Sequence, residues 1–265
     1  MVRVTPTDRR TALRAGAGIV AGSAFAAACT PAGPPSGPAA RHTPTSSAPA
    51  ARVPARPAPA PRAYPGHPAQ ITHGPRDRPR VALTFHGQGD PATARALLDE
   101  AERHGARVTV VAVGTWLEEH GGLARRILDG GHDLGNHTHR HLAVNALPAA
   151  EAEREIVACA QRLRRLTGSI GTWFRPSRAA RASPTVEALA RRAGYPHVLS
   201  YDVDSLDFTS PGGPAVARTV LDTIRNGSVV SLHFGYADTV AALPAVLAEL
   251  HRRGLRAVTT TELLS

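Results

Sequence analysis

The sequence predicts an α/β protein in which parallel strands alternate with helices. Short apolar runs typical of strands recur along the chain, and the segments between them have apolar residues at helical spacing. One run, residues 108–113, is apolar without interruption, as expected for a strand buried on both faces of a parallel sheet. Residues 80–265 suffice to enclose one sizeable core. These observations favour a parallel sheet or barrel covered by helices.

Residues 1–29 have the pattern of an export signal. The pair Arg9-Arg10 precedes a weakly apolar run, residues 15–28, that is too short to span a bilayer, and small residues then lead into Cys29. The twin arginines resemble a Tat signal, and the small residues before the cysteine resemble a lipobox. We expect Cys29 to become the lipidated first residue of the mature protein. The alternative is ordinary cleavage near Ala28, with Cys29 incidental.

Residues 30–79 are predicted to form a disordered linker rich in proline and alanine. The stretch has almost no large apolar side chains, so it buries too little surface to offset the entropy of ordering. Of the formal net charge of +10, residues 1–79 carry +8, from ten arginines and two aspartates. This basic tether suits an anionic cell envelope. The folded part carries only +2 and aromatic residues are 4% of the chain, which argues against a nucleic-acid-binding domain.

The folded segment, residues 80–265, begins with a strand at Val81–Phe85, a helix at Pro91–His104, a strand at Val108–Val113 and a short helix at Leu123–Leu128. The remaining elements continue the alternation, with helices expected at 149–166, 183–193, 214–225 and 238–253, and strands at 172–174, 197–201, 228–232 and 256–260. Cys159 falls on the apolar stripe of the helix at 149–166, which predicts a role in the core. With Cys29 as the only other cysteine, no disulfide framework is available within the domain.

Polar side chains directly follow several of the predicted strands. They are His86, Arg175, Asp204, Asp207 and His233. In parallel α/β folds, functional groups gather at the carboxyl ends of the strands. The shared position makes this set a candidate site, although any one member alone also suits a capping or surface role.

The segment from Gly130 to His141 contains two histidines four residues apart. If it starts a helix, His137 and His141 project from one face a single turn apart and can bind one metal ion, whereas His139 points elsewhere. The chain has thirteen histidines, so such a pair is weak evidence when taken alone.

Four stretches carry these candidates in a fixed order along the chain. They are Gly131–His141, with the two histidines; Phe174-Arg175-Pro176; Tyr201–Phe208, with two aspartates; and Gly227–His233. In this order they resemble the motifs of the polysaccharide deacetylase family, the NodB-homology carbohydrate esterases of family 4. Two positions depart, since Phe208 takes the place of a tryptophan and Ser231 that of a leucine. The resemblance covers residues 80–265 and implies a distorted (β/α) barrel that hydrolyses N- or O-acetyl groups on a polysaccharide.

The resemblance also implies roles for the individual residues. His137 and His141 are expected to bind Zn²⁺ or another divalent metal such as Co²⁺, which polarises the acetyl carbonyl and activates water. His233 is expected to protonate the departing sugar amine, and Asp207 to hold the far nitrogen of His233. Arg175 orients the catalytic base in relatives, and Asp204 is expected to be a structural capping carboxylate.

The first family motif is altered in this chain. Relatives read Thr-Phe-Asp-Asp-Gly-Pro, in which the first aspartate is the base and the second a metal ligand. Here residues 84–91 read Thr-Phe-His-Gly-Gln-Gly-Asp-Pro, so His86 occupies the base position and Gly87 the ligand position. Glycine has no side chain to bind a metal, and two histidines alone make a poor zinc site.

Three hypotheses follow from this alteration. In the first, the glycines let the loop fold back so that Asp90 becomes the third metal ligand and His86 the base. In the second, His86 completes a three-histidine metal site and Asp90 is the base, which the orienting role of Arg175 favours. In the third, the site is inactive and the domain only binds glycan. Position alone favours the first.

The expected partner is an acetylated polysaccharide, bound by a monomer that is exported to the outer face of the cytoplasmic membrane or the cell wall, or secreted. A lipid at Cys29 would be its only membrane contact. Peptidoglycan amino sugars suit such a tethered protein, but chitin and acetylated xylan fit the same motifs.

Overall fold

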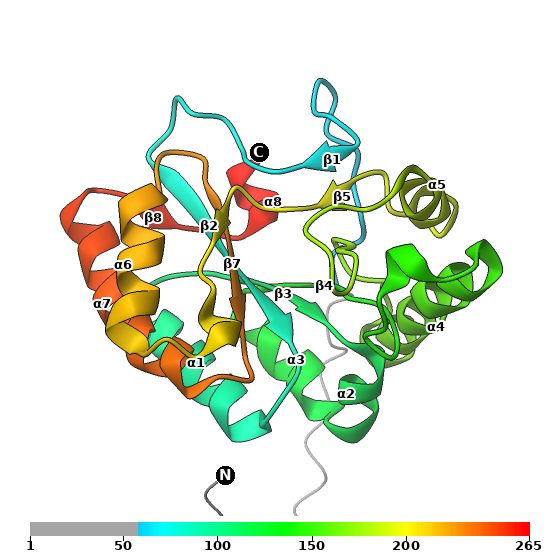
Figure 1. Ribbon diagram of the computed structural model, residues 1–265, viewed down its shortest axis with the longest axis horizontal. Coiled ribbons are helices and arrows are strands. Elements are labelled where there is room, and N and C mark those ends of the chain that lie inside the picture. Colours follow the sequence, from blue (N-terminus) through cyan, green and yellow to red (C-terminus); the bar gives the residue numbers. More distant parts are fainter. Residues whose placement is uncertain (1–57) are drawn as a thin grey trace, which may run out of the picture. The chain divides into compact units, whose positions relative to one another are not determined.

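A parallel sheet lies at the centre of the computed structural model, which describes residues 58–265 (Figure 1). Its strands run in the order β4 (Asp133–Asn136), β3 (Thr109–Ala112), β2 (Arg80–Gly87), β7 (Val229–His233) and β6 (Val203–Asp204). Every neighbouring pair in this order is parallel. A further strand, β8 (Arg256–Ala257), pairs with the first residues of β2. The parallel sheet predicted from the sequence is therefore present.

Two short strands extend the sheet beyond β4. Strand β1 (Gln70–Ile71) pairs in parallel with β5 (Val198–Leu199). Phe174 forms isolated parallel bridges to Asn136 of β4 and to Val198 of β5, so it joins the two parts. The predicted strand at 172–174 is thus reduced to one bridging residue, and the sheet continues through it around the core.

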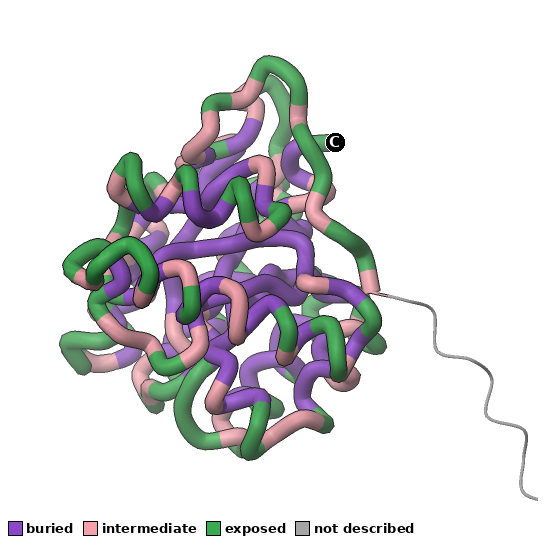
Figure 2. The backbone as a smooth tube through the Cα atoms, turned by 90° about the vertical axis from the view of Figure 1, so that its right-hand side faces the viewer, coloured by how far each residue is buried: buried purple, intermediate pink, exposed green. Residues whose placement is uncertain are grey.

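Helices cover the sheet and enclose the apolar core. They are α1 (Pro91–Arg103), α2 (Gly114–Glu119), α3 (Gly122–Asp129), α4 (Ala149–Thr167), α5 (Pro184–Arg192), α6 (Gly213–Thr223), α7 (Ala237–Arg252) and α8 (Thr260–Leu263). Figure 2 shows the buried backbone running through the middle of the domain, with exposed residues in the outer helices and loops. Cys159 is fully buried in α4, and burial raises the pKa of its thiol to about 12, as suits a core residue. None of the helices among the described residues is long and apolar enough to cross a membrane.

The folded part begins earlier than the linker predicted for residues 30–79. Residues 58–79 lie against the domain, and Ile71 of β1 is fully buried. The Tyr64 ring stacks on Trp173 at 5.4 Å between centroids, and the Tyr64 amide donates a 2.9 Å hydrogen bond to Nε2 of His197. The boundary at residue 79 is therefore wrong, because a few apolar side chains in a proline-rich stretch find buried partners. The export signal, Cys29 and linker residues 30–57 lie outside the described residues.

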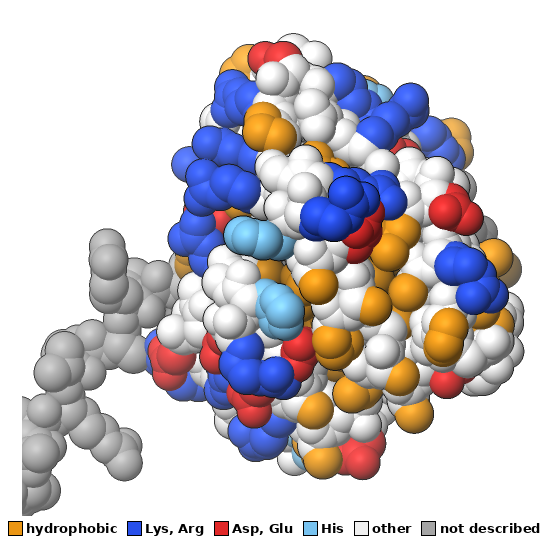
Figure 3. All heavy atoms as spheres, turned by 90° about the vertical axis from the view of Figure 1, so that its left-hand side faces the viewer, with side chains coloured by type: hydrophobic (Ala, Val, Ile, Leu, Met, Phe, Trp, Pro, Cys, Tyr) orange, Lys and Arg blue, Asp and Glu red, His pale blue; other side chains and the backbone are white. Residues whose placement is uncertain are grey.

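The outer face of α6 and α7 is charged but mixed. Figure 3 shows basic and acidic side chains close together on this side of the molecule. On α7, for example, Glu249 pairs with Arg252 at 2.6 Å and with Arg253 at 2.7 Å. These exposed pairs contribute little stability individually.

Candidate functional site

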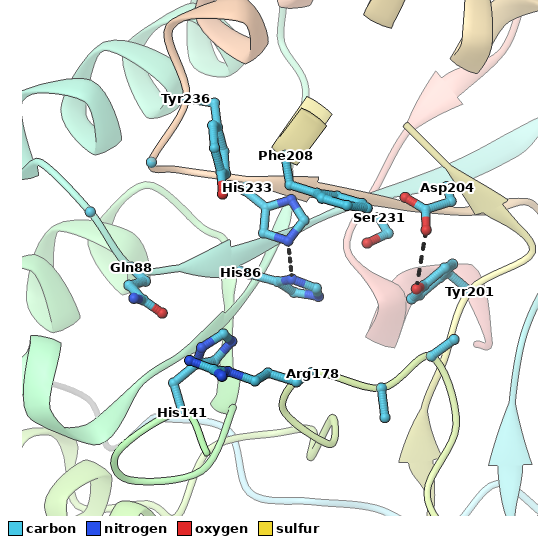
Figure 4. Close-up of a pocket in the computed structure, with 14 residues that line it drawn as sticks. His86, Gln88, His141, Arg178, Tyr201, Asp204, Phe208, Ser231, His233 and Tyr236 are labelled. Carbon is cyan, nitrogen blue, oxygen red and sulfur yellow. Dashed lines mark hydrogen bonds between the residues drawn. The ribbon is translucent and has the colours of Figure 1, made fainter. Parts of the chain in front are cut away.

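A pocket of about 600 Å³ opens at the carboxyl ends of β2, β6 and β7 (Figure 4). Its lining includes His86 from the end of β2, His233 from the end of β7 and Asp204 from the end of β6. Ser231 comes from β7 and Phe208 from a 3-10 helical turn at Asp207–Thr209, and loops contribute the other labelled side chains: Gln88, His141, Arg178, Tyr201 and Tyr236. The pocket thus lies at the carboxyl ends of the strands, where the sequence predicted the functional residues.

Four of the predicted residues form one hydrogen-bonded line beside this pocket. Arg175 Nη1 lies 3.1 Å from His86 Nε2. His86 Nδ1 lies 2.7 Å from His233 Nε2, the contact that Figure 4 marks with a dashed line. His233 Nδ1 in turn lies 2.6 Å from Asp207 Oδ1. His86, His233 and Asp207 meet because β2, β7 and β6 are neighbours in the sheet. Arg175 follows the bridging residue Phe174 and reaches His86 from another part of the sheet.

The donors in this line assign the ring protons. A guanidinium can only donate, so His86 Nε2 must be an acceptor and the proton of its neutral ring must lie on Nδ1. His86 Nδ1 then donates to His233 Nε2, and His233 Nδ1 donates to Asp207. Burial and the neighbouring His137, His233 and Arg175 lower the pKa of His86 well below its usual value, in agreement with a neutral ring. In this arrangement His86 has no free lone pair, so it can act neither as a metal ligand nor as a base.

Asp207 anchors the far end of the line. Its carboxylate is fully buried and accepts hydrogen bonds from the His233 amide at 2.8 Å, from His233 Nδ1, and from Thr239 Oγ1 at 2.6 Å. Burial acts to raise the pKa of Asp207, but the hydrogen bonds from His233 and Thr239 outweigh it and leave the pKa lowered. The ionised carboxylate thus holds His233 in the place predicted from the sequence.

Arg175 anchors the near end of the line and is buried without a carboxylate partner among the described residues. Its Nε donates to the Leu199 carbonyl at 3.0 Å, and its Nη2 donates to Thr84 Oγ1 and to the Ser200 carbonyl. The guanidinium also lies 5.4 Å from the centroid of the Tyr201 ring. Burial lowers the pKa of Arg175 to about 10, so the group remains charged at neutral pH. The arginine therefore orients His86, where relatives place a carboxylate base.

His137 and His141 lie together, but not on a helix. Strand β4 ends at Asn136, and Thr138 and His141 have left-handed backbones, with φ of 66° and 56°. The premise of one helical turn was therefore wrong, although this tight loop still brings the two ring centroids to 4.9 Å. A buried turn can place residues i and i+4 together as effectively as a helix does.

The His137 ring has the hydrogen bonding of a metal ligand. Its Nδ1 lies 3.0 Å from the Arg175 carbonyl, to which it donates, while its buried Nε2 has no hydrogen-bond partner in the described part of the chain. Such a fixed tautomer with a bare second nitrogen is typical of metal-binding histidine. Burial lowers the pKa of His137 well below its usual value, and burial together with Arg178 and His233 lowers that of His141 to about 4. Both rings are thus neutral and able to donate a lone pair.

A third protein ligand is missing from this pair. Asp90 is exposed, and its Oδ1 accepts a 2.8 Å hydrogen bond from the Ala92 amide as the cap of α1, so the structure does not place it as predicted. His86 has both nitrogens engaged and stacks on His137 instead of sharing an ion with it. Within residues 58–265 no group of three or more His, Cys, Asp or Glu side chains could hold a metal. The residues present fit a metal site with two histidines, not the predicted site with three ligands.

Glu155 on α4 is a supporting residue that the sequence did not single out. Its buried carboxylate accepts hydrogen bonds from the amides of His139 and Arg140, at 3.1 and 2.7 Å, and from Arg140 Nε at 2.6 Å. It therefore holds the loop between His137 and His141. In the sequence, the only feature that could have pointed to this role is that Glu155 lies on the helix that follows the histidine segment.

Phe208 places an exposed apolar side chain in the lining of the pocket. Phe208 and its neighbour Leu206, which are 47% and 44% exposed, are the exposed large hydrophobic residues of the described chain. Asp204, expected to be a capping carboxylate, does accept from the Leu206 amide at 3.2 Å, but it also lines the pocket and accepts from the Tyr201 hydroxyl.

Comparison with known sequences identifies a matching family model and a relative that covers most of the folded part. The family model described as polysaccharide deacetylase matches residues 73–198. A peptidoglycan-N-acetylglucosamine deacetylase from Bacillus cereus is 31% identical over 194 residues, which cover 72% of this chain and 90% of the relative.

Comparison with solved structures gives the same fold. A carbohydrate esterase family 4 pseudoenzyme from Bacillus anthracis has a TM-score of 0.70 at 23% identity, covering 75% of this chain and 70% of that one. A peptidoglycan N-acetylglucosamine deacetylase has a TM-score of 0.69 at 25% identity, covering 74% of this chain and 92% of that one. The predicted (β/α) barrel type is thereby confirmed. On the strength of the long match to the Bacillus cereus relative, the chain belongs to the polysaccharide deacetylase family of hydrolases.

Proposed function

We propose that this protein removes N-acetyl groups from the amino sugars of a cell-wall polysaccharide, with peptidoglycan as its substrate. The observation that carries the proposal is the buried Asp207–His233 pair at the edge of a pocket that also contains the neutral ring of His141. The Bacillus cereus relative, which acts on peptidoglycan N-acetylglucosamine by its name, supports the choice of substrate.

His233 is the residue that we expect to deliver the proton to the leaving group. Hydrolysis joins water to the acetyl carbon and breaks the bond to the sugar nitrogen, so the proton that the attacking water loses must reach this nitrogen for it to leave as an amine. Asp207 accepts from His233 Nδ1, which directs Nε2 toward the substrate side, where it can take the proton from the attacking water and pass it to the leaving nitrogen. His233 Nε2 now accepts from His86, so donation to a substrate requires that His86 release this hydrogen bond. We infer that His86 holds His233 in position until the substrate enters.

A divalent cation, Zn²⁺ or Co²⁺, would be held by His137 and His141. When bound, it would supply Lewis-acid polarisation of the acetyl carbonyl. With two protein ligands instead of the usual three, its affinity should be lower than in a complete catalytic zinc site.

A second candidate function is glycan binding without catalysis. The missing third ligand and the closed hydrogen-bonded line through His86 favour it. In both cases we propose that residues 1–29 export the chain, that Cys29 is lipidated, and that the domain acts as a monomer outside the cell.

Acetate release from the full chain distinguishes the two functions. The assay compares peptidoglycan, chitooligosaccharides and acetylated xylan, each with added Zn²⁺, with Co²⁺ or with a chelator. If the protein is a deacetylase, wild type should release acetate from at least one glycan and His233→Ala should release none. His251 is exposed on α7, so His251→Ala is the matched control and should release acetate as wild type does. Retention of the glycan without any acetate would support the binding function, and acetate release by His233→Ala at the wild-type rate would refute the assigned role of His233.

A further inference from the structure

One cationic side chain in the pocket has no acidic partner in the described part of the chain. Arg178 lines the pocket and is exposed, and none of the ion pairs formed within residues 58–265 includes it. The acidic side chain in the pocket lining is Asp204, which is already bonded to Tyr201 and to the Leu206 amide. Figure 4 shows Asp204 on the opposite side of the pocket from Arg178. The charge of Arg178 is therefore available to a ligand.

The backbone at Arg178 is held in an unusual conformation. Its φ is 54°, in the left-handed region that non-glycine residues adopt at a cost in free energy. The preceding residue, Ser177, is buried; its Oγ donates to the Leu142 carbonyl and accepts from Thr138 Oγ1 at 2.9 Å. These contacts tie Arg178 to the histidine loop, and strain retained at a pocket wall is a reason to look for a function.

The side chain lies beside the centre of the site. In Figure 4 the Arg178 side chain extends alongside the His141 ring and into the pocket. His141 and Arg178 line the same pocket. A sugar whose acetamido group lies at His141 and His233 therefore presents its neighbouring substituents to this guanidinium.

A guanidinium recognises carboxylate well, because its planar N–H groups form two parallel charge-assisted hydrogen bonds. We propose that Arg178 binds a carboxylate carried by the sugar at or next to the acetylated position, so that the pocket selects acidic glycans over neutral ones. This inference rests on the proposed function for the identity of the substrate as an acetylated glycan. Two sources supply the chemistry: the lactyl ether of a muramic acid, and the ring carboxylate of a uronic acid.

Equilibrium binding tests the proposal without requiring turnover. The full chain is titrated with two acidic probes, the disaccharide of N-acetylglucosamine and N-acetylmuramic acid and an oligosaccharide of N-acetylglucosamine and glucuronic acid. Each is compared with a derivative whose carboxylate has been reduced to an alcohol. We expect at least one acidic probe to bind about fivefold more tightly than its reduced form, with the difference diminishing at high salt. The probe that shows the difference identifies the source of the carboxylate.

Variants then assign the difference to Arg178. Arg178→Ala should remove the preference and Arg178→Lys should keep part of it, because lysine preserves the charge but not the planar pair of donors. Arg181→Ala is the matched control, since Arg181 is also exposed, lies on the same loop and does not line the pocket. Equal affinity of wild-type protein for the acidic and reduced forms of both probes, or an undiminished preference in Arg178→Ala, would overturn the inference. Acetate release is measured separately, so a chain that binds acidic glycan but releases no acetate refutes the proposed function alone.

Discussion

Replacing Glu155 tests whether the histidine loop depends on a residue that touches neither substrate nor metal. The carboxylate is 2% exposed and accepts three hydrogen bonds, from the amides of His139 and Arg140 and from Arg140 Nε. Glu155→Ala removes all three and leaves the amides of half-buried His139 and exposed Arg140 without their acceptor. A hydrogen bond to a charged group contributes about 1.5–3 kcal/mol, and part of this loss is recovered by water at the exposed Arg140. We therefore expect Glu155→Ala to lower the free energy of unfolding by about 3 kcal/mol.

A loss of this size is measurable by thermal unfolding. For a domain of this length, about 3 kcal/mol corresponds to a decrease of roughly 6–12 °C in Tm. The loop between His137 and His141 should also lose its shape, because Thr138 and His141 have left-handed backbones that need external support. We therefore expect Co²⁺ titration, followed by the absorption of the bound ion, to show weaker binding in Glu155→Ala than in wild type.

A glutamate two residues away provides the control. Glu153 lies on the same helix, and its carboxylate forms an exposed 3.4 Å pair with Arg192. Glu153→Ala should change stability by less than about 0.5 kcal/mol. If Glu155→Ala were no less stable than Glu153→Ala, the role assigned to Glu155 would be wrong. If its stability fell but Co²⁺ affinity did not, Glu155 would support the fold without positioning the histidines.

Four further outcomes are expected. A chain that begins at residue 80 should be less stable than one that begins at residue 58 by about 4 kcal/mol in chemical unfolding, because it loses buried Ile71 and the Tyr64–Trp173 stack; equal stability would refute the packing of residues 58–79. Asp207→Asn should destabilise the protein by about 3 kcal/mol at pH 7. The pKa of Asp207 is lowered in the folded protein, so its carboxylate contributes its full stabilisation above the unfolded pKa near 4 and loses it as pH falls through the folded pKa. The free energies of unfolding of wild type and Asp207→Asn should therefore converge when they are measured at acid pH. Gly87→Asp should not create a third metal ligand, because a Cβ at this position would lie 2.9 Å from Val110 Cγ1 and 3.0 Å from Ala112 Cα. We expect this variant to lose about 2 kcal/mol of stability through overpacking. A gain in its Co²⁺ affinity would contradict this prediction. Both His137→Ala and His141→Ala should abolish Co²⁺ binding, and retention of binding in either would refute the two-histidine site.

Local sequence signals predicted most helices because each helix has its own start and its own apolar stripe. Ser183-Pro184 marks the start of α5, where Ser183 Oγ accepts from the Val186 amide. Strand β4 was missed because Asp133–Asn136 has only one large apolar residue, Leu134, and the strand forms because β3 lies beside it. The opposite error occurred at residues 58–79, where composition indicated a linker but Ile71 and Tyr64 found partners more than a hundred residues away.

The sequence alone determined the family, the parallel α/β class and the set of polar residues at the strand ends. These depend on local periodicity and on motifs, both of which can be read along the chain. Only the tertiary structure decided how those residues are bonded: Asp90 caps a helix, His86 lies between Arg175 and His233, and His137 keeps a bare nitrogen. The reason is that hydrogen-bond partners within a site come from different strands, and their distances follow from the register of the sheet.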